Sequence, residues 1–369
     1  MADTVKNVAL VIEARRYSGW KSIKITRSIE GLAGSFSLAV TDRWGGQNEA
    51  WPIDEGDACR VEIDGERVIN GFVDKIGIAA AADERSITFS GRDKTADIVD
   101  CSVLVPDAST KGNKWTYRNV DISKFAAAIA NQHGINVTAQ PGLKLKPDPL
   151  LVAHPGESGF EAIKRAAASA GVLVVSDGDG GLLITRAGTQ RVTSLAEGVN
   201  IKSGSIEYDA TDRFHRYLIT SQPPGSDESS GEQLRVQAEA TDADVLRVNR
   251  VLVVRPEKGY DHASAKKRAD WEARIRAAKS ATLMVTVRGW RQPNGKLWPV
   301  NAISHVDAPR LFRVKGDMLI SQVEYGLDDS GQLTTLHLVR PDAFTPEPQA
   351  VVSGEALWKE LTPDKVVKK

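Results

Sequence analysis

The sequence predicts a mainly β protein with α+β insertions: two related antiparallel β-barrel domains, a small α+β domain, and a segment of loop and helix. Three observations indicate this fold class. Short alternating apolar runs separated by turn residues fill both ends of the chain, the middle changes to helical spacing, and one stretch near each end repeats a pattern. At roughly 100–200 residues per domain, a chain of 369 residues accommodates several such parts.

The first barrel is expected over residues 1–103. Apolar and polar residues alternate over 23–26 and again over 35–40, which is typical of half-buried strands. Asp64-Gly65 separates two further apolar runs, and this pair favours a hairpin because both residues tolerate a positive φ. Several short strands at this spacing favour an antiparallel barrel.

A small α+β domain is expected over residues 104–195. Asp121 precedes apolar residues at helical spacing and is a suitable N-cap. Ser158 and Glu161 have the spacing of a capping box, which predicts the start of a second helix. Two apolar runs within 173–184 flank a Gly- and Asp-rich turn, so we expect a hairpin there.

The rest of the chain returns to strand patterns around a helical insertion. Strand chemistry resumes near Tyr217 and Ile219, and again from Leu283 onward. The expected parts are a second barrel over 196–222 and 281–345, an insertion of loop and helix over 223–280, and a tail over 346–369 with a short helix over 356–361. The polar loop (222–232) begins where the insertion starts, and the helix is expected over 261–279.

An internal repeat relates the two barrels. Residues 68–74 (Val-Ile-Asn-Gly-Phe-Val-Asp) resemble residues 318–324 (Met-Leu-Ile-Ser-Gln-Val-Glu), and each stretch is followed by an alternating strand and then by Arg92 or Arg340. Either one barrel is duplicated, or two strand pairs have converged on a generic pattern. Duplication predicts that Arg92 and Arg340 occupy matching places.

Composition excludes several classes of protein. Lys+Arg and Asp+Glu are both 48, so the net charge is zero. This argues against a polyanion-coating protein, which needs a basic excess, and it favours association. No apolar run has the length of a membrane span, and the start lacks a secretory signal pattern. Cys59 and Cys101 cannot form a disulfide framework, so we expect two thiols in a protein made in a reducing cytoplasm.

Sequence motifs of catalytic, nucleotide-binding and metal-binding sites are missing or incomplete. The chain has no phosphate-binding glycine loop, no dinucleotide fingerprint and no His-Glu-x-x-His pair, and its six histidines are scattered. Asp177 and Asp179 alternate with glycines as in calcium loops, but the other ligand positions are lacking, which favours a tight turn. We therefore expect no catalytic, cofactor-binding or metal-binding residues, no cofactor, and no enzymatic activity.

Two further segments admit a functional and a structural interpretation. Residues 154–159 (His-Pro-Gly-Glu-Ser-Gly) superficially resemble a hydrolase serine motif, although Ser158 is better placed as a helix cap. The basic helix over 261–279 is compatible with phosphate contact, and also with a solvated face or a subunit contact.

Four ordered blocks of residues resemble the baseplate hub proteins of Mu-like contractile-tailed phages. The blocks are Tyr17–Ser22 with Thr26–Glu30 and Ala33–Phe36, then Gly91–Asp97 with Ile98–Cys101, then Gly289-Trp290 with Gly295–Trp298 and Asn301, and finally Leu319–Val323. Together they span most of residues 8–345 in the order of the family.

The resemblance implies a structural hub in the tail baseplate of the virion. It implies a homotrimer in which three chains supply six quasi-equivalent barrels around one channel, joining the hexameric tail tube to the trimeric central spike. The implied partners are the chain itself, the tail tube or distal tube protein, the central spike protein and other baseplate proteins. DNA is contacted only in transit during ejection, and no membrane-spanning segment is expected.

Two alternatives remain open. The same architecture forms the spike base of type VI-like and tailocin injection machines, where a fused spike domain would be expected; residues 350–369 are too short for one, so a separate spike polypeptide is expected. A tail-associated cell-wall hydrolase would need paired carboxylates or a Cys/His site within 115–190, and no such spacing stands out.

Overall fold

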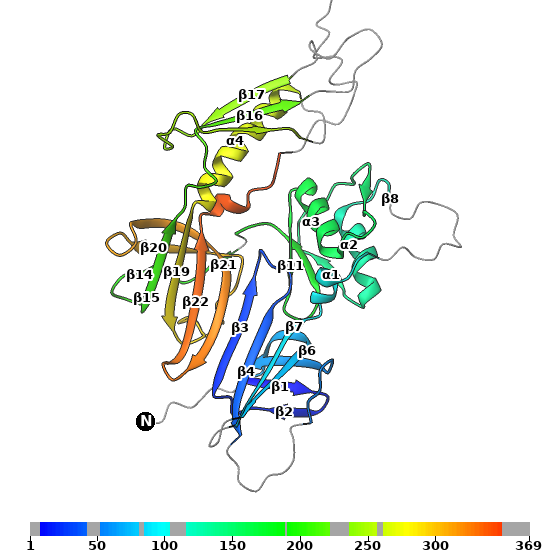
Figure 1. Ribbon diagram of the computed structural model, residues 1–369, viewed down its shortest axis with the longest axis vertical. Coiled ribbons are helices and arrows are strands. Elements are labelled where there is room, and N and C mark those ends of the chain that lie inside the picture. Colours follow the sequence, from blue (N-terminus) through cyan, green and yellow to red (C-terminus); the bar gives the residue numbers. More distant parts are fainter. Residues whose placement is uncertain are drawn as a thin grey trace, which may run out of the picture. The chain divides into compact units, whose positions relative to one another are not determined.

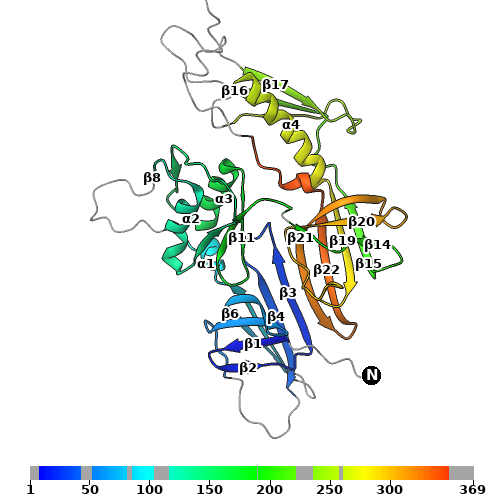
Figure 2. The same ribbon diagram turned by 180° about the vertical axis from the view of Figure 1, so that it is seen from behind.

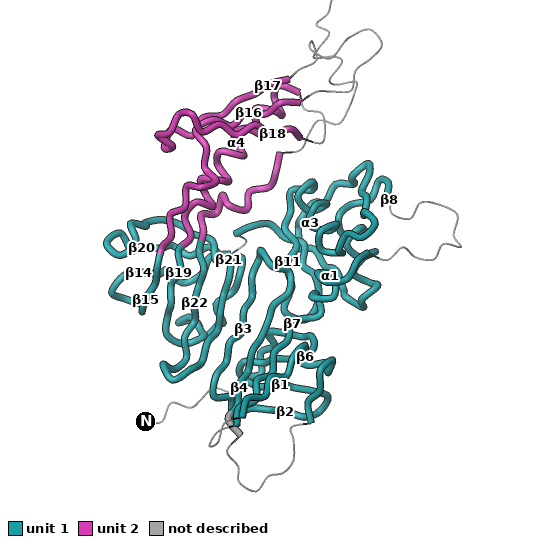
Figure 3. Tube along the Cα trace, viewed as in Figure 1, with its two compact units in different colours: residues 1–205, 283–338 teal, residues 206–282, 339–369 magenta. Residues whose placement is uncertain are grey.

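The computed structural model describes residues 8–42, 52–80, 85–103, 116–188, 190–221, 236–256 and 261–348. The chain divides into two compact units, one of Met1–Ser205 with Leu283–Leu338 and one of Ile206–Thr282 with Val339–Lys369 (Figure 3). The predicted polar loop over 222–232 and the predicted helix over 356–361 lie outside the described residues.

Fourteen strands form one large sheet (Figures 1 and 2). Its N-terminal half-sheet consists of β1 (Val8–Ile12), β2 (Arg15–Tyr17), β3 (Ser22–Ser28), β4 (Ser35–Asp42), β5 (Ala58–Ile63), β6 (Glu66–Ala80) and β7 (Arg85–Asp93). Its C-terminal half-sheet consists of β13 (Gln190–Arg191), β14 (Leu195–Ala196), β15 (Ser203–Tyr208), β19 (Ala281–Arg288), β20 (Ala302–Ala308), β21 (Val314–Asp328) and β22 (Gly331–Val339).

The predicted strand patterns match the burial of these strands. Ile23 and Ile25 of β3 are buried, whereas Lys24 between them is exposed, because successive side chains of a strand point to opposite faces. Asp64 and Gly65 join β5 to β6 with φ values of 51° and 82°, which confirms the predicted hairpin.

The two half-sheets share one strand order. It is β3-β4-β7-β6-β5-β1 in the first and β15-β19-β22-β21-β20 in the second, where β13 and β14 both pair with the remaining edge of β20. Three pairs of equivalent strands have equal lengths: β4 and β19 have eight residues, β6 and β21 have 15, and β7 and β22 have nine. One difference is that β1 runs antiparallel to β5, whereas β13 and β14 run parallel to β20. The common order supports duplication rather than convergence.

The positions of the two repeated arginines can be compared by counting from the end of the strand that each one follows or belongs to. Arg92 is the residue before the end of β7, and Arg340 is the residue after the end of β22. Counted from these ends, the two arginines are therefore two residues out of register. Arg92 and Arg340 thus lie near the same place in the repeat without matching it residue for residue.

The two half-sheets are continuous rather than separate. β21 pairs with β3 and joins them into one sheet that runs from β15 to β2. Among the described residues, no pairing closes either half-sheet on itself. The fold is therefore mainly β, as expected, and closure of each half-sheet into a barrel stays a prediction.

The α+β domain carries both predicted helices. Asp121 accepts hydrogen bonds from the amides of Ser123 and Lys124 and caps α2 (Ile122–Ala130). Ser158 and Glu161 form the expected capping box of α3 (Gly159–Ala170). The shorter elements are α1 (Ala96–Asp100), β8 (Thr116–Tyr117), a 3-10 turn (Asn131–His133), β9 (Val137–Ala139) and β10 (Leu151–Val152).

The predicted hairpin of this domain is also present. β11 (Leu173–Ser176) and β12 (Leu182–Thr185) pair antiparallel, and β9 adds to β12 in parallel. The apolar faces of α2 and α3 pack with this small sheet around Phe125, Ile129 and Ile163, all of which are fully buried.

The second unit is larger than the predicted insertion of loop and helix. It contains β16 (Arg216–Ser221), β17 (Val236–Thr241), β18 (Val251–Val254), α4 (His262–Lys279) and a 3-10 turn, η2 (Pro341–Phe344). The sheet order is β17-β16-β18, and α4 packs on β16 and β17. Tyr217 and Ile219, which the sequence pattern places in the second barrel, belong to the core of this unit because their apolar face meets Ala265 and Ala269 of α4.

No helix in the described ranges combines the length and apolar character needed to cross a membrane.

Candidate assembly surface

The residues considered above as candidate catalytic or metal-binding residues do not lie together in one site. Within the described part of the chain, no three His, Cys, Asp or Glu side chains are grouped so as to hold a metal ion. The imidazole of His215 bonds to the Val245 carbonyl at 2.7 Å, and that of His305 lies 3.0 Å from Asp317. These histidines thus interact with local structural partners.

The Gly- and Asp-rich segment at 177–181 is a tight turn, as predicted. One Asp177 carboxylate oxygen accepts hydrogen bonds from the amides of Asp179 (2.7 Å) and Gly181 (2.9 Å). Gly178 and Gly180 adopt φ values of 86° and 87°, which only glycine accepts readily. The Asp177 carboxylate therefore stabilises its own loop.

The same turn attaches the α+β domain to the N-terminal half-sheet. The Asp179 carboxylate lies 3.1 Å from the Arg67 guanidinium. The backbone carbonyl of Asp179 accepts a hydrogen bond of 2.6 Å from the side-chain amide of Asn70. A Cβ at Gly180 would lie 3.0 Å from atoms of Asn70, so glycine permits this close approach.

A buried carboxylate makes a second attachment. Asp93, at the end of β7, is 1% exposed. It accepts hydrogen bonds from the Ser176 hydroxyl (2.6 Å) and from the amides of Gly34 (3.0 Å) and Thr95 (2.8 Å). A buried carboxyl group requires hydrogen-bond partners, and here the donors come from β11, from the loop before β4 and from the start of α1.

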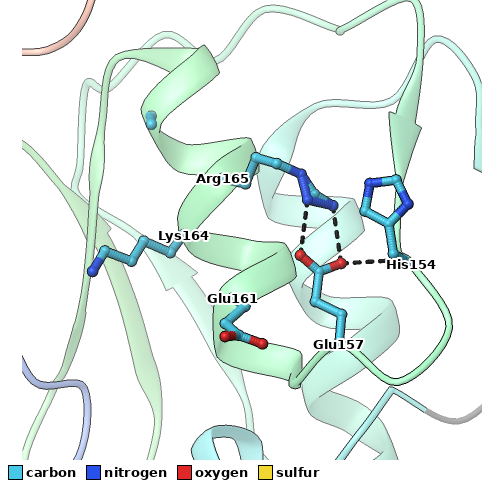
Figure 4. A pocket seen from close by; sticks show the side chains of 6 residues that line it. His154, Glu157, Glu161, Lys164 and Arg165 are labelled. Atoms are coloured by element: carbon cyan, nitrogen blue, oxygen red, sulfur yellow. Dashed lines mark hydrogen bonds and ion pairs between the residues drawn. The ribbon is translucent and has the colours of Figure 1, made fainter. Parts of the chain in front are cut away.

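The hydrolase-like segment lies at a shallow groove beside α3, shown in Figure 4. Arg165 donates to both carboxylate oxygens of Glu157 (2.8 and 3.0 Å) and to the Val152 carbonyl. Glu157 also accepts from the His154 amide at 2.9 Å. The Ser158 hydroxyl accepts from the Glu161 amide and caps the helix. These polar groups hold α3 to the loop before it, and the geometry contains no hydroxyl–imidazole pair for nucleophilic catalysis.

The basic helix α4 pairs several of its charges internally. Arg268 and Arg276 both bind the carboxylate of Glu272, at 2.8 and 3.0 Å, and Lys266 binds Asp270 at 2.6 Å. The guanidinium of Arg268 also stacks on the ring of Trp271. This pairing gives these cations a structural role within the helix.

The junction between the half-sheets is an antiparallel ladder. Six residue pairs align β21 with β3, from Gln322 opposite Ser28 to Leu327 opposite Ile23. Lys24 and Glu324 form an ion pair of 2.9 Å across this ladder. Tyr325 is 2% exposed, and its hydroxyl donates to the Trp298 carbonyl.

A second contact supports the junction from one side. Arg291 follows β19, and its guanidinium lies 3.2 Å from Asp64 and 3.0 Å from Glu66. These two acidic residues belong to the β5–β6 hairpin of the N-terminal half-sheet. The half-sheets are therefore fixed to each other by a strand ladder and by a charged loop contact.

One face of the sheet near this junction is rich in hydroxyl groups. We call it the hydroxyl face; residues that pair directly across strands share it. It carries Ser22, Thr26 and Ser28 of β3, Ser35 and Ser37 of β4, Ser86, Thr88 and Ser90 of β7, Thr286 of β19 and Thr335 of β22.

Two cations of the hydroxyl face are ion-paired. Lys24 is paired with Glu324, and Arg92 binds Asp74 (2.9 Å) and Asp100 (2.7 Å). Hydrogen bonds from Arg92 hold the pKa of Asp100 below its usual value. Lys75 of β6 and Arg288 of β19 are also exposed on this face, so the surface is polar and keeps some positive charge.

Comparison with known proteins identifies relatives over most of the chain. Residues 7–93 match the family model "Mu phage baseplate assembly protein GpP-like, N-terminal", residues 95–186 match "Baseplate hub protein gp44-like, second domain", and residues 261–347 match "Mu phage baseplate assembly protein GpP, fourth domain". The chain is 30% identical to the baseplate hub protein gp44 of Escherichia phage Mu over 339 residues, which covers 89% of this chain and 86% of that protein.

Solved structures agree with the sequence match. The 43 kDa tail protein of prophage MuSo2 from Shewanella oneidensis superposes with a TM-score of 0.81 at 33% identity, covering 92% of this chain and all of that one. A tail protein from Neisseria meningitidis MC58 gives 0.76 at 21% identity, covering 93% and 99%. An Escherichia coli component of the type VI secretion system shares the fold at 10% identity and a TM-score of 0.52, covering 93% and 80%.

Proposed function

The chain belongs to the family of Mu-phage baseplate hub proteins, and from this premise we propose that it forms a homotrimeric ring between the hexameric tail tube and the trimeric central spike. As a member of this family it is a structural component of the virion, located in the tail baseplate. The trimer, the ring and its partners are the proposed part.

The observation that carries the proposal is the repeated strand order of the two half-sheets. Three copies of a chain with two equivalent half-sheets supply six similar units around one axis. A heterologous contact that closes after three copies gives threefold symmetry. Such a ring offers six similar surfaces to a sixfold tube and keeps a threefold arrangement for a spike.

The hydroxyl face suits the wall of a channel through which DNA leaves. Phosphate contacts from lysine and arginine supply most of the non-specific affinity of proteins for DNA. A wall with many unpaired cations would therefore retain the passing strand. Hydroxyl groups hydrate the wall without this attraction, and the ion pairs of Lys24 and Arg92 reduce the remaining charge.

The second candidate is the spike base of a type VI-like or tailocin machine. The fold shared with the type VI component supports it at the level of architecture alone. An enzymatic role as a cell-wall hydrolase is not part of the proposal, because Ser158 and the carboxylates around α3 are engaged in capping and ion pairing. A peptidoglycan-clearing assay is expected to be negative.

The experiment that tests the proposal is the solution mass of the purified protein by light scattering at several concentrations. A mass of three times the 39.9 kDa chain supports the ring. A mass of one chain at every concentration, unchanged after the purified spike protein is added, would contradict it.

A further inference from the structure

We infer that the outer half of β6 pairs with β15 of a second copy of this chain, and that this pairing forms the contact between subunits. The inference rests on the proposed ring and deepens it by naming the two strand edges that close it. It follows from comparing the two half-sheets with each other.

The pairing of β21 in the C-terminal half-sheet is the model for the proposed contact between subunits. Along one edge, β21 lies beside β22. Along the other, its first half pairs with β20 and its second half, from Gln322 to Leu327, pairs with β3. Along this second edge, β21 thus pairs with one strand of its own half-sheet and with one strand of the N-terminal half-sheet.

β6 is the equivalent strand of the N-terminal half-sheet, and half of one edge lacks a neighbour. One edge lies beside β7 from Gly71 to Ala80. On the other, β5 pairs with residues from Glu66 to Phe72, and beyond Val73 no described strand pairs with β6. Ile78 in this outer half is 60% exposed.

The complementary edge is that of β15. By strand order, β15 is the equivalent of β3, and it lies beside β19 as β3 lies beside β4. β3 uses its second edge to bind β21. On the second edge of β15 the described part of the chain places no strand. Tyr208 at its end is 60% exposed, whereas the residues of β3 that face the core, such as Ile25, are fully buried.

A second copy is the occupant that fits both edges. The edges differ from each other, so their contact is heterologous and generates a ring, as a closed trimer requires. Unpaired strand edges are templates for pairing with another chain. The charges also agree, since the outer half of β6 carries Lys75 and β15 carries Glu207, both exposed. The same antiparallel ladder would then repeat at all six junctions.

The first test is a substitution on the edge. We expect Ile78→Asp to reduce the three-chain species to single chains at concentrations where the wild type is trimeric. Ile78 is already largely exposed, so the folded chain should keep its circular dichroism spectrum and its unfolding midpoint. The matched control is Leu150→Asp, another exposed apolar residue at 45% exposure, which should leave the mass unchanged.

The second test is cross-linking with a short bismaleimide in a Cys101→Ser background. Ile78→Cys is combined in turn with Ile206→Cys and Tyr208→Cys, which lie on one face of β15. At least one pair should give denatured products of two and three chains and nothing larger. Thr26→Cys with Glu324→Cys, a directly paired position within the chain, should cross-link without raising the mass.

The outcomes separate the inference from the proposed function. A wild-type trimer that survives Ile78→Asp and gives no intersubunit cross-link would overturn the strand pairing and leave the ring standing. Cross-linked ladders beyond three chains would also overturn it. A wild type that is always a single chain would contradict the proposed ring itself.

Discussion

The Ser176 hydroxyl donates a hydrogen bond of 2.6 Å to the buried carboxylate of Asp93, and this contact links β11 of the α+β domain to β7 of the N-terminal half-sheet. The Gly34 and Thr95 amides donate to the same carboxylate. One side chain therefore satisfies donors from three segments that are distant in sequence.

Removing this carboxylate should destabilise the first unit. Asp93→Ala leaves several buried donors without an acceptor, so we expect the free energy of unfolding to fall by about 3 kcal/mol. Asp93→Asn keeps one acceptor oxygen and should cost less. Urea denaturation measures both, with Glu55→Ala as an exposed control. Equal stability of Asp93→Ala and the control would contradict the role assigned to Asp93.

Stability should depend on His337 as the pH falls. Burial lowers the pKa of His337 in the folded chain, although Glu324 opposes this effect. Below about pH 6.5, the ordinary value for histidine, the unfolded state binds a proton that the folded state resists, so stability decreases with decreasing pH. Urea unfolding of wild type and His337→Gln between pH 8 and 5 should show a weaker decrease for the variant. Identical slopes would refute this assignment.

The two thiols should differ in reactivity. Burial raises the pKa of Cys59 to about 12, with Asp74 and Asp57 adding to the effect, whereas Cys101 is exposed. Since the thiolate is the reacting species, Ellman's reagent at pH 8 should titrate one thiol per native chain and two in urea. Rapid reaction of two thiols in the folded protein would show that the β1–β5 region opens readily.

Lysines on the hydroxyl face should retain DNA. We expect the trimer of a Ser37→Lys/Thr88→Lys/Thr335→Lys variant to bind linear duplex DNA in low salt and to release it as salt is raised, whereas the wild type binds weakly. A closed ring cannot be threaded by circular DNA, so closed circles should bind far less than linear fragments.

The matched control places three lysines at exposed apolar positions elsewhere: Leu150→Lys, Val199→Lys and Leu246→Lys. This variant should bind linear and circular DNA equally. If the hydroxyl-face variant also makes no distinction between the two DNA forms, the face does not line a channel.

Local features of the fold were predictable from the sequence because their causes are local. Asp64-Gly65 specifies a hairpin by its backbone freedom, and Asp121 and Ser158 specify helix starts by satisfying free amides. The four resemblance blocks predicted the family, which the comparison with the Mu hub protein confirmed.

The features missed by sequence reasoning depend on contacts between distant segments. No sequence pattern near Gln322 or Ser28 indicates that these residues face each other at the junction. The sequence around Asp93 likewise does not indicate that its side chain is buried. β18 is a four-residue apolar run whose partner, β16, lies beyond a long insertion, so its sheet was not predicted. The repeat in the sequence was the one signal that reached across this distance.

Electron microscopy of the purified protein viewed end-on tests the trimeric ring most directly. We expect an open ring of threefold symmetry with six similar density peaks around a central hole. A three-lobed particle without an opening, or a particle in which the two half-sheets of each chain lie at different radii, would contradict it.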